Sequence, residues 1–416
     1  MKVLIAGAGP GGLTAALCLA QAGIECEVFE AVPRVQQLGV GLNLLPHGVR
    51  VLTILGMGDW LASAGIATAE LGYFNKFGSE IWREPRGIAA GYRWPQFSIH
   101  RGSLQKLLLD EYEARIGSPR LHAGWHLASF EQDAGCVTAR FLDKETGAPR
   151  EEQHADVLVA ADGIHSVARQ RFYPNEAKPP YCGRVLWRAV SEAPPFLTGR
   201  SMIMAGYANR KFVAYPISDV SPQTGRALIN WVADVYVGGD KPPIPRDWNR
   251  RVDQATVLPY FEDWRFDWLD IPALIRGAEV VYEYPLVDRD PLPRWSFGRV
   301  TLLGDAAHPM YPIGSNGASQ AILDAASLSA ALTLHGDPVR ALQAYEAERL
   351  ETTSRIVLSN RGQGPEIVMQ MVEDRAPNGF RNLYEVISRQ ELEEVSNRYK
   401  AVAGFDRDRL NSMPSS

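Results

Sequence analysis

The feature that most constrains the fold is a cluster of glycines directly after a short apolar run at the start of the chain. Residues 3–6 read Val-Leu-Ile-Ala, and glycines follow at 7, 9, 11 and 12. An apolar run bounded by glycines predicts a buried strand and a tight turn. Residues 13–22, rich in Ala and Leu, predict a helix that ends at Gly23, and residues 25–30 predict a second strand.

The spacing of these glycines fits the Gly-x-Gly-x-x-Gly motif, with Pro10 and Gly11 between its second and third glycines. Gly7 is expected to make the turn, Gly9 to let the backbone approach a pyrophosphate, and Gly12 to let the helix pack on the strand. The helix N-terminus would offer N–H groups to phosphates. Glu30 ends the second strand, where a carboxylate accepts hydrogen bonds from ribose hydroxyls and disfavours a 2′-phosphate. The segment therefore predicts an FAD or NAD site.

Charge and composition exclude several classes of protein. The 416 residues are 46% hydrophobic and 22% charged, which is typical of a soluble globular protein. The net charge of -5 argues against a general nucleic-acid binder and against binding to an anionic membrane surface. Glycines interrupt the apolar N-terminus, so we expect no signal peptide or spanning helix there. The four cysteines lack metal-ligand spacing, so we expect no metal site, reduced thiols and a cytoplasmic location.

Two later segments repeat the pattern of a buried strand that ends in an acidic turn. In residues 156–163 the apolar run ends at Asp162, and in residues 299–305 it ends at Gly304 and Asp305. The second segment continues through a Gly-rich loop at 314–318 into a predicted helix at 319–332. A carboxylate at such a position can hold a ribityl or ribose hydroxyl, and the loop amides would point at an electron-rich group. A flavin has such a group at its N1–C2=O edge, so these segments favour FAD over NAD.

These three ordered motifs, together with Arg101 in the segment 98–102, resemble the class A flavoprotein aromatic hydroxylases, the para-hydroxybenzoate hydroxylase fold family. The resemblance covers about residues 1–360. Residues 95–102, 284–293 and 303–324 resemble the phenazine-modifying branch of that family. The resemblance implies an FAD-dependent monooxygenase that uses NADH or NADPH and O₂. It would hydroxylate a flat aromatic or N-heteroaromatic ring through a flavin C4a-hydroperoxide, with or without decarboxylation.

The resemblance also implies a set of cofactor-binding residues. No side chain is expected to be catalytic in its own right, since the flavin carries the chemistry; Pro312 and Gly314 are the candidates for positioning it. The implied cofactor-binding residues are Gly7, Gly9, Pro10, Gly11, Gly12, Glu30, Val40, Gly41, Arg101, Gln105, Asp162, Gly304, Asp305, Pro312, Gly314, Asn316 and Gly317. From the residues alone, Asp162 fits a turn cap as well as a cofactor contact.

The fold class expected is α/β, and α+β overall, with a Rossmann-like FAD-binding domain formed by residues 1–70, 98–175 and 280–340. Runs rich in β-branched and aromatic residues at 184–190, 212–217 and 227–232 predict an inserted, mostly antiparallel sheet. With 71–97, residues 176–279 would form the substrate domain. Residues 341–416 read as a C-terminal helical segment, which would cover either the active site or another subunit.

Four residues of the inserted sheet are candidates for substrate contact. Arg188 would pair a substrate carboxylate, although strand alternation allows it to point outward. Tyr207 would hydrogen-bond the substrate, and Tyr215 and Trp231 would either stack on a flat ring or fill the sheet core. His165 and His308 could act as general bases, but the sequence favours a role as loop or core histidines that bond to the backbone.

Two other functions remain open from the sequence. One is a flavin-dependent dehydrogenase or reductase of the same fold, without oxygen insertion. The other is a non-enzymatic flavin-binding sensor. The expected partners are a small aromatic substrate and O₂, with neither nucleic acid nor membrane, in a monomer or a homodimer.

Overall fold

The glycine motif opens a six-stranded sheet at the centre of one layer. The computed structural model describes residues 1–33, 39–177, 181–239, 250–362, 364–404 and 406–414. The strands of the six-stranded sheet lie in the order β21 (Ser296–Phe297), β22 (Val300–Leu302), β12 (Val157–Ala160), β1 (Lys2–Ala6), β2 (Glu25–Glu30) and β8 (Leu121–Ala123). All neighbours are parallel except β21 and β22. Strands β1 and β12 are almost wholly buried, because both faces of the sheet are covered.

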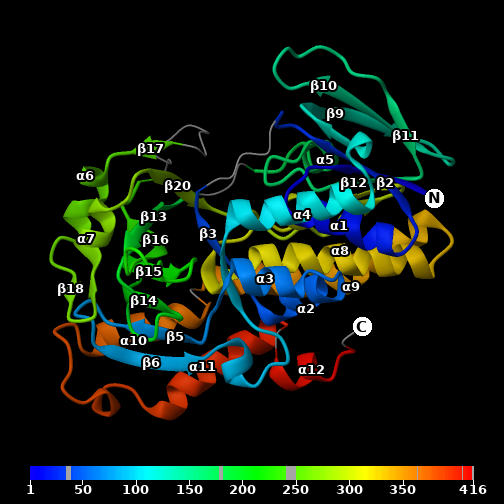
Figure 1. Cartoon of the computed structure of the whole chain (residues 1–416). Helices are drawn as coiled ribbons and strands as arrows, with labels where there is room; N and C mark the ends of the chain where they lie inside the picture. The colour runs from blue at the N-terminus through cyan, green and yellow to red at the C-terminus, as the bar shows by residue number, and fades with distance from the viewer. Residues whose placement is uncertain (34–38, 178–180, 240–249, 363, 405, 415–416) are drawn as a thin grey trace.

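Helices cover one face of this sheet and a small sheet covers the other (Figure 1). The helical face contains α1 (Pro10–Gln21), α4 (Arg101–Arg115), α8 (Gly317–Leu334) and α9 (Pro338–Arg361), with α2 (Pro46–Ile54) and α3 (Gly58–Ala64) outside them. The opposite face carries β9 (Trp125–Gln132), β10 (Val137–Asp143) and β11 (Gln153–Ala155). Helix α1 begins at Pro10, earlier than the sequence predicted, because proline lacks the N–H that the first helical residue leaves unpaired.

A second sheet of eight strands stands beside the first, at the left of Figure 1. It contains β17 (Arg251–Val252), β20 (Val281–Val287), β13 (Tyr181–Ala193), β16 (Ala227–Tyr236), β15 (Arg210–Pro216), β14 (Ser201–Tyr207), β5 (Glu70–Phe74) and β6 (Glu80–Pro85). The expected antiparallel arrangement is confirmed for all neighbours but one, since β14 and β5 are parallel. Its outer face packs against α6 (Gln254–Val257), α7 (Ile271–Arg276) and the hairpin β18 (Arg265–Phe266) and β19 (Leu269–Asp270).

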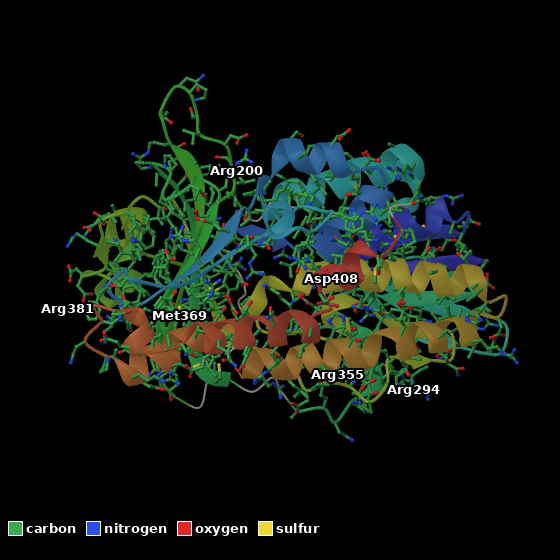
Figure 2. The ribbon with its side chains drawn as sticks, turned by 90° about the horizontal axis from the view of Figure 1, so that it is seen from below. Arg200, Arg294, Arg355, Met369, Arg381 and Asp408 are labelled. Atoms are coloured by element: carbon green, nitrogen blue, oxygen red, sulfur yellow. The ribbon has the colours of Figure 1, made fainter. Side chains whose placement is uncertain are left out.

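The two layers are joined by a further three-stranded sheet and by the C-terminal segment. In this sheet β3 (Gly41–Leu44) and β4 (Ile66–Ala67) both pair with β7 (Phe97–His100). The C-terminal segment contains α10 (Ile367–Arg375), α11 (Arg389–Val402) and α12 (Arg407–Asn411). Figure 2 shows it from below, running from the eight-stranded sheet near Met369 to the helical layer near Asp408. Among the described residues, no helix has the length and apolar character needed to cross a membrane.

Candidate active site

A cavity of about 370 Å³ lies between the helical layer and the inner face of the eight-stranded sheet. One end is formed by the glycine turn, the turn after β22 and the start of α8. The other end is formed by the sheet and by Glu366 of the C-terminal segment. Its wall therefore combines segments that are about 300 residues apart in the sequence, at 9–12 and 303–318.

The glycine turn leaves open space at the position that the motif reserves for a ligand. Gly7 has a φ of 110°, and a Cβ there would lie 2.3 Å from the Ala161 carbonyl oxygen. A Cβ at Gly12 would lie 2.0 Å from the Gly7 oxygen. Around Gly9, by contrast, no described atom comes within 4 Å of a Cβ, and this residue lines the cavity. Helix α1 starts directly after Gly9, so its first N–H groups border the same space.

Three of the predicted cofactor residues support this turn from behind. Glu30 accepts the Ala8 N–H at 2.7 Å and the Val32 N–H at 2.8 Å, one on each carboxylate oxygen. Gln105 Nε2 donates to the Ala8 carbonyl at 3.0 Å. Val40, which is buried, accepts the Arg101 N–H at 2.9 Å. These bonds fix the backbone of the turn and the start of α4, and none of the three side chains lines the cavity.

Arg101 and Asp305 line the cavity from the helical layer and are accessible to solvent there. Surrounding protein limits that access, and this burial raises the pKa of Asp305, against the opposing charges of His308 and Arg101. Burial also lowers the pKa of Arg101, and Arg188 acts in the same direction. Two opposite charges that face one cavity are suited to a ligand that carries both donors and acceptors.

Asp162 caps the turn after β12, as one of its two predicted roles requires. Its Oδ2 accepts the Val167 N–H at 2.8 Å, at the start of α5 (Val167–Phe172). Its Oδ1 is buried and has no hydrogen-bond partner among the described residues. Burial raises the pKa of this carboxyl to about 6. The adjacent Ala161 and Gly163 line the cavity, so an unsatisfied acceptor lies directly beside it.

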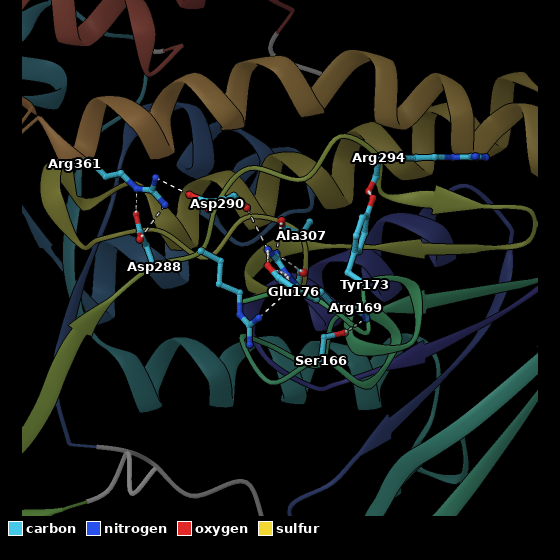
Figure 3. Close-up of polar contacts among 11 residues, drawn as sticks. Ser166, Arg169, Tyr173, Glu176, Asp288, Asp290, Arg294, Ala307 and Arg361 are labelled. Carbon is cyan, nitrogen blue, oxygen red and sulfur yellow. Dashed lines mark hydrogen bonds and ion pairs between the residues drawn. The ribbon is translucent and has the colours of Figure 1, made fainter. Parts of the chain in front are cut away.

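Arg169, which no sequence motif had indicated, links the loops on the far side of this site. Its side chain is 1% exposed and donates to the Ala306 and Ala307 carbonyls at 3.2 and 2.9 Å (Figure 3). It also pairs with Glu176, which accepts a second bond from Arg289. Its only signal in the sequence was its position seven residues after Asp162, where a buried strand was predicted to end.

His308 is a core residue rather than a group that faces the cavity. Its Nε2 lies 2.5 Å from Asp324 Oδ2, and Arg349 Nε donates to Asp324 Oδ1 at 2.8 Å. Asp324 also accepts the Gly304 N–H at 3.1 Å. Burial raises the pKa of this carboxyl, but its contacts with His308 and Arg349 lower it to about 2. Asp324 thereby holds the turn that presents Asp305.

Strand alternation decides which residues of the eight-stranded sheet face the cavity. Arg188 and Tyr215 line it, whereas Trp187 lies on the opposite face. Arg188 Nη2 donates to the Gly41 carbonyl at 2.8 Å, and its Nε is buried without a partner among the described residues. The inner face of the sheet also contributes an apolar strip of Leu186, Met202, Met204, Val213 and Val232 to the cavity wall, together with members of a buried ionic cluster. The ionic cluster consists of Arg184, Lys211, Asp234 and Glu366.

Two of the four predicted substrate residues do not line the cavity. Trp231 is fully buried on the opposite face of the sheet, where it stacks on Phe212 and donates to Ser191 Oγ at 3.0 Å. Tyr207 lies at the end of β14, with Lys76 Nζ 5.5 Å from its ring centre. The sequence shows the alternation of a strand but not which of its two faces meets the ligand. For the same reason the ionic cluster was not anticipated.

Residues 1–216 and 287–359 match the protein family described as FAD binding domain. The chain belongs to this family and is an FAD-dependent aromatic-ring monooxygenase. It is 45% identical over 361 residues to the phenazine 1,6-dicarboxylic acid hydroxylase PhzS of Lysobacter antibioticus, which covers 86% of this chain and 89% of that protein. It is 30% identical over 375 residues to the 3-hydroxybenzoate 6-hydroxylase of Polaromonas naphthalenivorans, covering 88% and 87%.

The fold is also that of a solved enzyme of this class. The crystal structure of HpxO from Klebsiella pneumoniae, complexed with FAD and uric acid, superimposes with a TM-score of 0.76 at 27% identity. The match covers 100% of this chain and 98% of that chain. FAD is therefore the cofactor, with NAD(P)H as the typical reductant. The open space at Gly9, the two helix starts and the unpaired Asp162 Oδ1 fit a ligand that has phosphates, hydroxyls and a polar ring edge.

Proposed function

We propose that this enzyme hydroxylates a flat, phenazine-like heteroaromatic ring that carries a carboxylate. The observation that carries the proposal is the pairing of an apolar strip with one incompletely bonded guanidinium on the floor of the cavity. The strip would contact the face of the ring, and Arg188 would bind the carboxylate. The name of the relative PhzS supports this substrate class. So does the resemblance of residues 95–102, 284–293 and 303–324 to 5-methylphenazine-1-carboxylate 1-monooxygenase. Whether the carboxylate is lost depends on the ring carbon that is hydroxylated.

We also propose which residues would hold FAD. The amides of residues 9–12 and the N-terminus of α1 would bind the pyrophosphate. Glu30 would accept a ribose hydroxyl with the lone pairs that its backbone bonds leave free. Asp162 and Asp305 would accept hydroxyls of the ribityl chain, and Arg101 would contact the flavin. The remaining predicted contacts are Val40, Gly41, Gln105, Gly304, Pro312, Gly314, Asn316 and Gly317, of which Val40 and Gln105 would act through the backbone they hold.

The chain's own residues would do three things in the reaction. FAD, when bound, supplies the redox chemistry that passes electrons from NAD(P)H to O₂ and an oxygen atom to the ring. Arg188 would orient the ring by its carboxylate, at the end of the cavity where it also holds Gly41. The N-terminus of α8, at Gly317, would stabilise negative charge on the cofactor edge. The sheet and the segment around Glu366 would exclude water.

The experiment is a screen of NAD(P)H oxidation against phenazine carboxylates, hydroxybenzoates and quinolines, with the mass of each product measured. We expect the fastest coupled turnover with a phenazine carboxylate and a product that has gained one oxygen atom. Loss of CO₂ with gain of oxygen would identify decarboxylating hydroxylation. If phenazine carboxylates left all the electrons in H₂O₂ or failed to accelerate flavin reduction, the proposed substrate class would be refuted.

The wider proposals concern domain extent and surroundings. We propose an FAD-binding domain of residues 1–70, 98–175 and 280–340, a substrate domain of 71–97 and 176–279, and a C-terminal segment of 341–416. We place the enzyme in the cytoplasm, where NAD(P)H is supplied, as a monomer or homodimer that uses O₂ and binds no nucleic acid. The net charge of -5 supports the last point.

A further inference from the structure

The C-terminal helix α11 brings one buried hydroxyl against the back of the loop that precedes α8. Tyr399 is 5% exposed. Its Oη accepts a hydrogen bond from Asn316 Nδ2 at 3.0 Å, and it lies 3.3 Å from the Ile313 carbonyl and 3.1 Å from Asn360 Oδ1. The single hydroxyl proton can serve either of the last two acceptors. One side chain therefore joins the loop, the end of α9 and α11.

The loop has a conformation that needs such support. Gly314 has a φ of 69° and Ser315 has a φ of 56°, so two successive residues are left-handed and one of them is not glycine. A non-glycine residue in this region carries a conformational cost that the surroundings must offset. A Cβ at Gly314 would lie 1.8 Å from Tyr399 Oη, so the loop backbone lies directly on the tyrosine. The loop and the tyrosine thus determine each other's positions.

Further hydrogen bonds extend this support to both ends of the loop. Asn360, which contacts Tyr399, donates from Nδ2 to the Tyr311 carbonyl at 3.1 Å. Asn316, which donates to Tyr399, accepts from Gln320 Nε2 at 3.2 Å. Gln320 lies one turn further along α8 and also donates to the Ala403 carbonyl, just beyond α11, at 3.2 Å. Tyr399 therefore acts at the centre of a network that covers residues 311–320.

The other side of the same loop faces the cofactor end of the cavity. Tyr311, Pro312, Ser315, Asn316 and Gly317 all line it. Asn316 is fully buried by protein yet reaches the cavity wall, so it has Tyr399 on one side and the ligand space on the other. A shift of the loop would move the start of α8, whose amides face that space. The position of this helix start thus depends on the tyrosine behind it.

We propose that Tyr399 is a positioning residue for FAD, and that α11 is a structural part of the cofactor site. Its hydroxyl holds Asn316 and the loop backbone in the conformation that presents the start of α8 to the flavin. Because the loop is fixed before FAD arrives, binding does not have to order it, and affinity rises. The inference rests on the assignment of FAD and not on the proposed substrate. Failure of the substrate screen would therefore leave it standing.

The test is the FAD affinity of the Tyr399→Phe holoenzyme, measured by stepwise dilution and the fluorescence of released FAD. The matched control is Tyr112→Phe, because Tyr112 is also buried and donates to one backbone carbonyl, that of Arg120, at 2.6 Å. We expect the dissociation constant of FAD to rise about tenfold in Tyr399→Phe, the order expected when a buried group loses its partner. It should stay within about twofold of the unaltered enzyme in Tyr112→Phe, since net effects of remote hydrogen bonds fall on global stability.

A double variant separates positioning from general destabilisation. If Tyr399 acts through Asn316, Asn316→Ala should weaken FAD binding alone, and adding Tyr399→Phe should cost less than it does by itself. The visible spectrum of the flavin should shift in both single variants. The proposal is overturned if Tyr399→Phe keeps its FAD affinity and spectrum, if Tyr112→Phe loses as much affinity, or if the two effects at 316 and 399 are additive.

Discussion

Replacing Arg188 by methionine removes the guanidinium that would bind the substrate carboxylate but keeps a side chain of similar length. At about 4 Å and an effective dielectric constant of about 20, two unit charges attract by about 4 kcal/mol. After desolvation, a hydrogen bond to a charged group contributes about 1.5–3 kcal/mol. With about 1.4 kcal/mol for each factor of ten, KM should rise about 10- to 150-fold for a carboxylated ring. Arg101, which faces the same cavity, would keep the loss toward the lower end.

The assay compares steady-state kinetics for a ring carboxylate and for its uncharged carboxamide. KM for the carboxamide should stay within about threefold in Arg188→Met, because uniform binding to the ring face is retained. Arg188→Lys should lie between the two, since an ammonium keeps the charge but loses the fork that also reaches Gly41. FAD content is measured in parallel as the folding control. An equal rise of KM for both rings would refute the pairing and would assign Arg188 to holding the Gly41 strand.

Three further predictions concern the cofactor layer. Gly12→Ala should lose bound FAD and have a lower unfolding temperature, because its Cβ would lie 2.0 Å from the Gly7 oxygen. Gly9→Ala should lose FAD with little change in stability, because no described atom lies within 4 Å of its Cβ. Flavin absorbance and thermal unfolding of the two variants check this. Asp162→Asn should stabilise the FAD-free chain by up to about 3 kcal/mol above pH 6 and hardly at all below pH 4. In the folded chain the pKa of this carboxyl is raised to about 6, so its ionisation destabilises the folded state as the pH rises from the unfolded pKa through 6, and asparagine removes that effect. A stabilisation by Asp162→Asn of equal size at pH 4 and pH 8 would contradict the prediction. Arg169→Met should lower the free energy of unfolding in urea by about 3–5 kcal/mol, because Glu176 loses its buried partner. Arg289→Met should lower it less, because Glu176 still has Arg169. Similar losses in both variants would argue against the central role of Arg169.

Local sequence patterns predicted most of the cofactor layer. Strand β2 has the predicted bounds, β12 and β22 lie inside the predicted apolar runs, and β1 begins at Lys2, one residue before its predicted run. The runs of β1, β12 and β22 were recognisable because each is short, apolar and closed by glycine or an acidic residue. Residues 338–360 also read as a helix from their sequence, and helix α9 spans Pro338–Arg361. These elements depend on interactions between residues close in the sequence, which a single sequence contains.

The substrate side depends on long-range pairing and was predicted less well. Trp231 and Arg188 were both candidate pocket residues, and only the folded sheet shows that Arg188 faces the cavity whereas Trp231 packs on the opposite face. The ion pair of Lys211 with Glu366 joins two residues far apart in the chain. Tyr399 was not identified either, because it belongs to no motif and lies far in the sequence from the loop of Gly314 that it contacts. No periodicity or spacing connects such residues before the chain is folded.

The order of strands in the central sheet has a consequence for biosynthesis. Strand β1 lies between β2 and β12, and β12 also needs β22, so the cofactor layer is completed only after residue 302 has been made. The start of α8, at Gly317, comes later still. At translation rates of about 5–20 residues per second, the glycine turn waits roughly 15–60 s for its partner loops. A nascent or truncated chain that ends before this point has the first half of the site but cannot complete it. Acquisition of FAD therefore distinguishes finished chains from incomplete ones.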